Sequence, residues 1–185
     1  MTRYIRRSGP LILMKLTEYE VTLLESLVEQ FAGLLEADTQ APAESDSFAR
    51  WQAELSNEDP LDHTDPVIRR LFPDAYPGDV PASEEFRRLT QARQRSDRLG
   101  QAEVVLSALR DADAGKHAVQ VRVIELDTWL KTITAVRLSL AVRLGIESAA
   151  DVETWESLPS DDPRSYLYEI YNWLSAVSEN LLGLR

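Results

Sequence analysis

The sequence predicts a mainly α-helical bundle with a small antiparallel β element, made of an N-terminal hairpin and one later strand. Several long stretches repeat apolar residues at the spacing of an amphipathic helix, whereas residues 3–16 and 116–123 have extended or alternating patterns. The 185 residues are enough to bury a substantial core. We therefore expect a single domain spanning residues 1–185.

The first predicted element is a β-hairpin in "RYIRRSGPLILMKL", residues 3–16. Its turn is Ser8-Gly9-Pro10, where glycine supplies a permissive backbone. A helix follows from Thr17, which can form a capping box with Glu20. The apolar positions of this helix recur at helical spacing: Leu24, Leu27, Val28, Phe31, Leu34 and Leu35.

An acidic connector occupies residues 36–65, interrupted by a short helix through "SFARWQAEL", residues 47–55. A long helix is then expected from Ser83 to about Asp111. Its predicted inner stripe consists of Leu89, Ala92, Ser96, Leu99, Ala102, Leu106 and Leu109.

The remaining elements are a strand and two helices. "KHAVQVRV" alternates valines with polar residues and predicts a strand that joins the hairpin, with an early helix start as the alternative. The next helix, residues 125–144, ends at Gly145, and the last begins with Asp162 as cap and Pro163 in its first turn. The expected inner faces are Leu126, Trp129, Leu130, Ile133, Val136, Leu140 and Leu144 in the first of these helices, and Leu167, Ile170, Tyr171, Leu174, Val177 and Leu181 in the second. Tyr168 and Trp173 lie off that stripe, so we expect one of them to mark a contact surface.

Composition excludes several classes of function. The net charge of −11 disfavours nucleic acid and anionic membranes as partners. The absence of Cys excludes disulfides, thiolate metal sites and thiol redox switches. No apolar stretch is long enough to span a bilayer, and the apolar run after the N-terminal arginines is too short for a signal peptide, so we expect a cytoplasmic protein.

No catalytic residue, cofactor site or metal site is predicted. His63 and His117 stand in no zinc-binding spacing, and the seven glycines form no phosphate-binding loop. An enzyme or small-ligand-binding domain with a site assembled from dispersed residues is one alternative. A DNA-binding regulator that uses the arginines between Arg87 and Arg98 is another; those are Arg87, Arg88, Arg93, Arg95 and Arg98.

Three segments, "DPVIRRLFPDAYPGD", "AVRLSLAVRLG" and "YNWLSAVSENLL", lie in this order behind a "TEYEVTLLESL" helix. In this respect the chain resembles an actinobacterial family catalogued as a domain of unknown function, number two-zero-one-seven. The resemblance implies a regulatory protein that acts through protein contacts, in either stress-linked transcription or Clp-associated proteolysis. Any version of that role that uses a Cys pair within the protein cannot apply to this chain, which has no Cys.

The segment 65–79 contains the candidate partner contact. Asp65 caps a short helix that Pro73 ends, so its apolar residues pack on the bundle while Arg69 and Arg70 project outward. Tyr76 follows; we expect its ring to hold the segment against the protein and its hydroxyl to form a hydrogen bond with a polar group. The arginines either neutralise Asp62, Asp65, Asp74 and Asp79 locally or engage an acidic surface of a partner.

A structural ion pair is also predicted between the last two long helices. Arg137 lies along the apolar face of its helix, where a buried charge needs a partner. Glu179 lies between Val177 and Leu181 on the last helix, and we expect it to supply the opposite charge.

Overall fold

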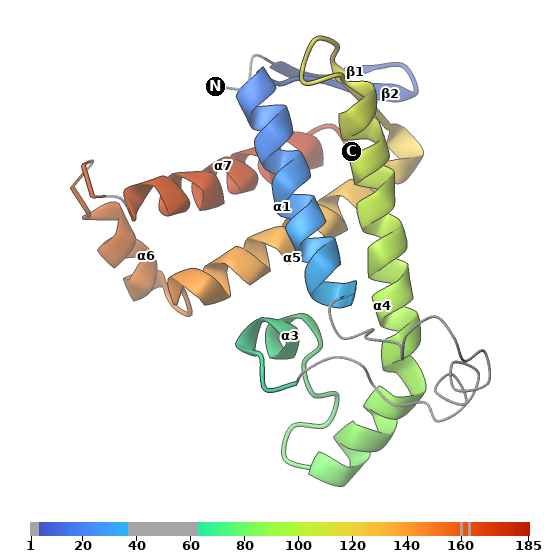
Figure 1. The fold of residues 1–185 in the computed structure, drawn as a ribbon, viewed down its shortest axis with the longest axis vertical. Helices are drawn as coiled ribbons and strands as arrows, with labels where there is room; N and C mark the ends of the chain where they lie inside the picture. Colours follow the sequence, from blue (N-terminus) through green and yellow to red (C-terminus); the bar gives the residue numbers. More distant parts are fainter. Residues whose placement is uncertain (1–3, 37–62, 160, 163) are drawn as a thin grey trace, which may run out of the picture.

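The computed structural model describes residues 4–36, 63–159, 161–162 and 164–185. In this part of the chain, helices form a bundle that a three-stranded antiparallel sheet closes at one end (Figure 1). The predicted fold class is confirmed. The short helix expected in residues 47–55 lies outside the described residues.

The sheet contains both predicted β elements. Its strands are β1 (Tyr4–Ser8), β2 (Leu11–Lys15) and β3 (Val119–Arg122), in the order β1-β2-β3. Gly9 forms the hairpin turn with a φ of 59°, in the left-handed region that glycine adopts readily. Ile12 pairs with Val121 and Met14 with Val119, and all four side chains are buried. The alternation seen in the sequence therefore gives the sheet its inner face.

The helices of the described residues are α1 (Glu18–Glu36), α3 (Pro66–Leu71), α4 (Val80–Asp111), α5 (Leu126–Leu144), α6 (Ala149–Glu156) and α7 (Ser165–Leu182). A 3-10 turn, Val123–Glu125, leads into α5. Gly145 ends α5 in the left-handed conformation, as predicted. α6 was not predicted from the sequence, although Ser148 and Asp151 form a capping box at its start.

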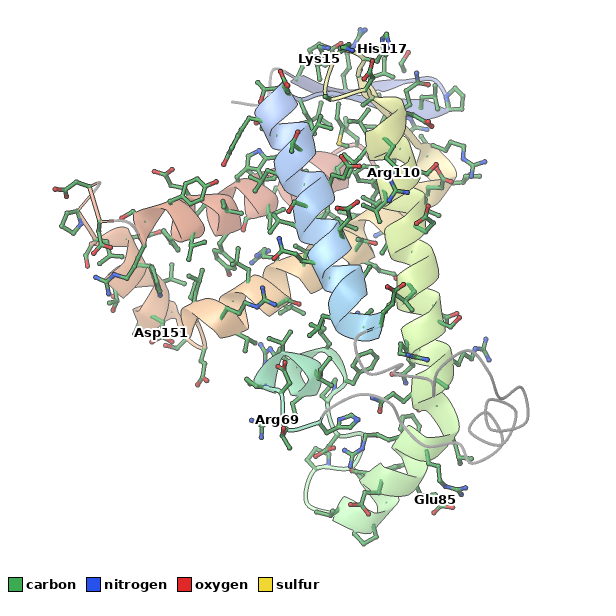
Figure 2. All side chains as sticks on the ribbon, in the orientation of Figure 1. Lys15, Arg69, Glu85, Arg110, His117 and Asp151 are labelled. Carbon is green, nitrogen blue, oxygen red and sulfur yellow. The ribbon has the colours of Figure 1, made fainter. Side chains whose placement is uncertain are left out.

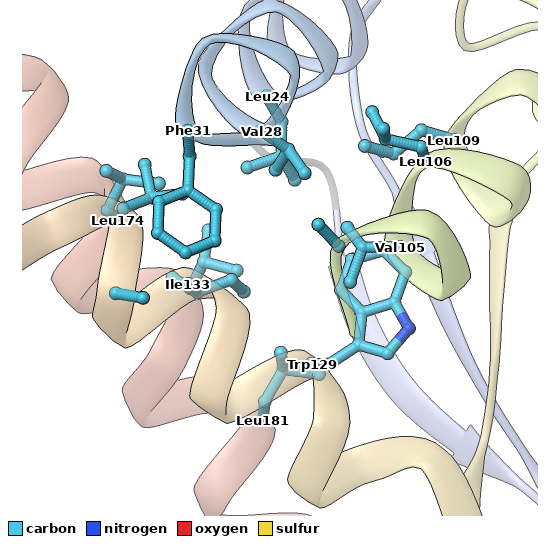
Figure 3. Close-up of a cluster of buried hydrophobic side chains, with 14 of the residues drawn as sticks. Leu24, Val28, Phe31, Val105, Leu106, Leu109, Trp129, Ile133, Leu174 and Leu181 are labelled. Atoms are coloured by element: carbon cyan, nitrogen blue, oxygen red, sulfur yellow. The ribbon is translucent and has the colours of Figure 1, made fainter. Parts of the chain in front are cut away.

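The core lies where α1, α4, α5 and α7 meet under the sheet (Figure 3). Trp129 is its largest fully buried side chain. Figure 3 shows other apolar side chains of the same cluster: Leu24, Val28 and Phe31 of α1, Val105, Leu106 and Leu109 of α4, Ile133 of α5, and Leu174 and Leu181 of α7. One apolar cluster thus unites all four long helices.

The starts of two helices differ from the prediction. α4 begins at Val80 because Asp79 accepts a hydrogen bond from the Ala82 amide, whereas Ser83 is already inside the helix. α7 begins at Ser165, and the Asp162 carboxylate binds the backbone N–H and the guanidinium of Arg164. Both differences are a few residues long.

Gly115, in the turn between α4 and β3, is fixed against the start of α1. Its φ is 80°, and a Cβ atom there would lie 3.0 Å from the Glu18 backbone nitrogen and 3.2 Å from the Thr17 carbonyl oxygen. We expect Gly115→Ala to lower the free energy of unfolding by about 1–3 kcal/mol. Gly78→Ala is the matched control, because Gly78 also has a positive φ, 94°, but no atom within 4 Å of its added Cβ. Urea unfolding of both variants tests this, and an equal cost for the two would show that the contact with α1 is unimportant.

Candidate functional site

The segment 65–72 forms the short docked helix that the sequence predicts. The Asp65 carboxylate accepts a hydrogen bond from the Val67 amide at 2.6 Å, and Pro66 occupies the first turn of α3. The helix ends at Phe72, directly before Pro73. Four apolar side chains of this segment are buried: Val67, Ile68, Leu71 and Phe72. They fasten α3 to the bundle, where it packs against α5.

Arg98 of α4 holds the C-terminal end of α3. Its Nη2 atom donates a hydrogen bond to the Leu71 carbonyl at 3.0 Å, and its guanidinium lies 5.1 Å from the centre of the Phe72 ring. Burial lowers the pKa of Arg98. A cation at the last carbonyls of a helix also complements the helix dipole. α3 is therefore held both by its apolar face and by its carbonyl end.

Two further arginines of α4 make intramolecular contacts. Arg95 donates to the Leu35 carbonyl at the end of α1, at 3.4 Å, and Arg87 forms an ion pair with Asp74. Together with Arg98, three of the five arginines in the candidate DNA-binding row are therefore engaged within the chain. The row does not form a continuous exposed basic face, and the DNA-binding alternative gains no support from it.

Arg69 and Arg70 are exposed on the outer side of α3. Figure 2 shows Arg69 in the half of the molecule away from Lys15 and His117 of the sheet region. Within the described part of the chain, neither guanidinium makes a hydrogen bond or an ion pair. The two arginines therefore remain available to a partner.

The acidic residues expected to neutralise this pair have other roles. Asp65 caps α3, Asp74 binds Arg87 and Asp79 caps α4. Asp62 lies outside the described residues. Local neutralisation by the first three carboxylates, which was one of the two interpretations of the arginines, is therefore not found.

Tyr76 is half exposed in the connection between α3 and α4. Its ring meets the edge of Phe86 at 6.1 Å, and Ser83 bonds both the backbone N–H and the carbonyl of Tyr76. The expected polar partner of its hydroxyl does not appear among the described residues. The aromatic side chain is thus presented to solvent on a backbone that is firmly held.

The N-terminal half of α4 exposes apolar residues that the sequence placed in the core. Leu89 is 65% exposed, and Ala92 and Ser96 are exposed as well. In that half the side facing the bundle carries Gln91, Arg95 and Arg98, whereas in the C-terminal half the predicted Ala102, Leu106 and Leu109 are buried, together with Val105. Leu89 lies three residues after the partly exposed Phe86, on the same side of the helix. Phe86 and Leu89 therefore extend the aromatic surface that Tyr76 begins.

We call these residues the α3–α4 corner: Arg69 and Arg70 of α3, Tyr76 of the connection, and Phe86 and Leu89 of α4. Sequence reasoning placed Leu89 in the core and assigned Phe86 to neither the core nor the surface. Apolar residues at helical spacing do not by themselves show which side of a helix is buried, so the sequence could not indicate that this part of α4 is exposed.

Comparison with known proteins identifies the family. The family model "Domain of unknown function (DUF2017)" matches residues 1–184. The chain belongs to the DUF2017 family. The resemblance seen in the sequence is thereby confirmed.

Two curated relatives of this DUF2017 chain carry the name "Oxidative stress regulator AosR", one from Mycobacterium bovis and one from Mycobacterium tuberculosis. Each is 26% identical over 187 residues, which cover 95% of this chain and 83% of the relative. The comparison with solved structures gave no significant match.

The ion pair predicted between Arg137 and Glu179 does not form. Arg137 lies with its guanidinium 5.0 Å from the centre of the Tyr171 ring and donates to the Tyr171 hydroxyl at 3.3 Å. Glu179 is exposed. A residue two positions from both Val177 and Leu181 points away from the face that those residues share, so Glu179 could not follow them into the core.

Tyr171 belongs to an aromatic stack that fastens α6 to the bundle. Trp155 stacks on Tyr168 at 6.2 Å, and Tyr168 stacks on Tyr171 at 6.1 Å. Tyr168 is buried and Trp173 is partly buried, so neither forms the exposed contact surface that the sequence suggested. Leu167 of the same helix, which was expected inside, is exposed.

A groove of about 510 Å³ lies between α4 and α5 in the DUF2017 chain. Its charged lining residues are Asp97, Arg98 and Lys131. Arg98 is already bound to the end of α3, so its lowered pKa is explained by burial there and not by a catalytic role. Among the described residues, no cluster of three His, Cys, Asp or Glu side chains could hold a metal ion.

Proposed function

We propose that this chain is a non-enzymatic regulatory protein in the response to oxidative stress, and that it acts by binding another protein through the α3–α4 corner. The single observation that carries the proposal is the exposed arginine pair on α3, which makes no hydrogen bond or ion pair with the described residues although the chain has a net charge of −11. The name of the curated relatives supports the link to oxidative stress.

The corner has the composition of a protein-binding surface. Arginine and aromatic residues are enriched at the centres of protein interfaces, and Tyr76 with Phe86 and Leu89 supplies apolar area beside the charges. The arginines favour an acidic patch on the partner, because complementary charge guides association and fixes orientation. α3 is held by its buried face and by Arg98, so little ordering is needed on binding.

The charge of the chain favours a protein over nucleic acid as the partner. None of the helices among the described residues combines the length and apolar character needed to cross a bilayer. The charge of the chain disfavours nucleic acid, and three of the arginines on α4 are engaged inside the protein.

Genetic complementation tests the regulatory role. In a cell from which the gene is deleted, we expect wild-type protein to restore the transcripts or protein levels that change after peroxide exposure, and Arg69→Glu with Arg70→Glu to fail. Arg6→Glu with Arg7→Glu is the matched control, since these adjacent exposed arginines lie on β1, at the sheet end of the molecule, and the change in net charge is the same. An unaltered peroxide response in the deletion strain would contradict the proposed role in stress.

A further inference from the structure

Two tyrosines from distant parts of the chain meet at the surface. The hydroxyls of Tyr19, in the first turn of α1, and Tyr166, in the first turn of α7, hydrogen-bond to each other across 147 positions of sequence. Tyr19 is 55% exposed and Tyr166 is 49% exposed. The pair is therefore both in contact and accessible to small reagents.

A second contact beside the pair fixes α1 relative to α7. The Trp173 indole N–H donates a hydrogen bond to the buried Glu20 carboxylate at 3.1 Å. Glu20 directly follows Tyr19 on α1, and Trp173 lies about two helical turns after Tyr166 on α7. The meeting of the two phenols is thus supported by the scaffold, and does not depend only on two exposed side chains.

In the part of the chain that the structure describes, the side chains most sensitive to oxidants are absent or buried. The chain has no Cys, and of its two methionines Met14 is fully buried while Met1 lies outside the described residues. After thiols and thioethers, phenols and indoles are the side chains that one-electron oxidants attack most readily. Other exposed tyrosines can also be oxidised, but the Tyr19–Tyr166 pair already brings two phenols together at the surface, where two radicals can couple.

We propose that the Tyr19–Tyr166 pair is an oxidative modification site, at which a one-electron oxidant such as the reactive intermediate of a haem peroxidase couples the two rings into dityrosine. Each phenol loses one electron and one proton to form a phenoxyl radical. The radicals join through a new carbon–carbon bond between the positions ortho to the hydroxyls. The two ring hydrogens move to the oxygens and restore both phenols, so one hydrogen peroxide is reduced to two waters for each link.

The geometry suits this product. In an ortho-linked biphenol the two hydroxyls remain neighbours, so the oxygen–oxygen contact already present is preserved when the bond forms. The hydrogen bond to Tyr166, partial burial and the nearby Glu169 carboxylate raise the pKa of Tyr19 to about 12. Tyr19 is therefore oxidised from its protonated form, and its proton passes to the solvent that the half-exposed side chain contacts.

The link would join the first turns of α1 and α7 covalently and raise the melting temperature of the protein. Its use as a stress signal depends on the proposed function, but the coupling reaction itself does not. A test of the reaction on purified protein can therefore fail or succeed independently of the proposed role in the stress response.

The experiment treats the purified full chain with hydrogen peroxide and a haem peroxidase. We expect monomeric protein that has lost two hydrogen atoms, dityrosine fluorescence, and a cross-linked pair of peptides containing Tyr19 and Tyr166. Tyr19→Phe and Tyr166→Phe should each abolish that peptide pair. Both variants keep their rings, and their melting curves show whether they remain folded. Tyr4→Phe, which removes another exposed tyrosine, should leave the yield unchanged.

Equal yield of internal dityrosine in folded Tyr19→Phe would overturn the proposal. So would links that form only between molecules, or a product located mainly at the stacked Tyr168 and Tyr171.

Discussion

Glu20→Ala is expected to lower the free energy of unfolding by about 2–4 kcal/mol. Glu20 is only 4% exposed, and its carboxylate accepts hydrogen bonds from the Thr17 amide at 2.8 Å and from the Trp173 indole at 3.1 Å. The substitution removes half of the capping box of α1 and deprives a part-buried donor on α7 of its acceptor. One side chain thus caps the start of α1 and connects α1 to α7.

Glu18→Ala provides the matched control for this change. Glu18 lies in the same first turn of α1 but is exposed, so its removal costs only its interaction with the helix dipole and nearby charges, about 0.3–1 kcal/mol. A double-mutant cycle with Trp173→Phe should give a coupling free energy of at least about 0.5 kcal/mol. If Glu20→Ala costs no more than Glu18→Ala in urea unfolding, the proposed connection between α1 and α7 is wrong.

The elements that the sequence predicted well are those determined by local physics. The hairpin turn at Gly9, the capping box of Thr17 and Glu20, and the end of α5 at Gly145 each depend on residues a few positions apart. The same holds for α3, whose cap, first-turn proline and terminating proline all lie within one short segment. Such features need no knowledge of the tertiary structure.

Predictions about which side of a helix faces the core were less reliable. Along α4, two rows of residues have helical spacing, and the more apolar row, which includes Leu89 and Ala92, is exposed in its N-terminal half. That half extends past the other long helices toward α3 (Figure 1), so the side covered is decided by α3 and the end of α1. Arg95 and Arg98 lie on that covered side because backbone carbonyls there accept their hydrogen bonds.

Contacts between elements distant in sequence could not be predicted at all. The partners of Arg137 and Trp173 depend on how α1, α5 and α7 cross, and so does the meeting of Tyr19 with Tyr166. For the candidate site, the sequence correctly placed Arg69 and Arg70 on the outer side of α3. The missing information was that the neighbouring carboxylates are occupied elsewhere, which leaves the pair without a partner among the described residues.

The second large effect concerns binding. Reversing both charges at Arg69 and Arg70 places acidic side chains against the acidic patch expected on the partner, where like charges cost several kcal/mol. We expect the affinity to fall by about 100-fold or more, which corresponds to roughly 2.7 kcal/mol. The fold should be unaffected, because both side chains are exposed and surface substitutions usually change the free energy of unfolding by no more than about 0.5 kcal/mol.

Quantitative affinity capture from the native cell tests the central claim most directly. Wild-type protein, Arg69→Glu with Arg70→Glu, and the control Arg6→Glu with Arg7→Glu are immobilised in equal, folded amounts, and the recovered proteins are compared at low and physiological salt. The account predicts a partner recovered by the wild type and the control but lost from the α3 variant. A sigma factor as that partner would indicate a role in transcription, and a Clp component a role in proteolysis. Equal recovery of the same partner by all three proteins would contradict the assignment of the α3–α4 corner as the contact site.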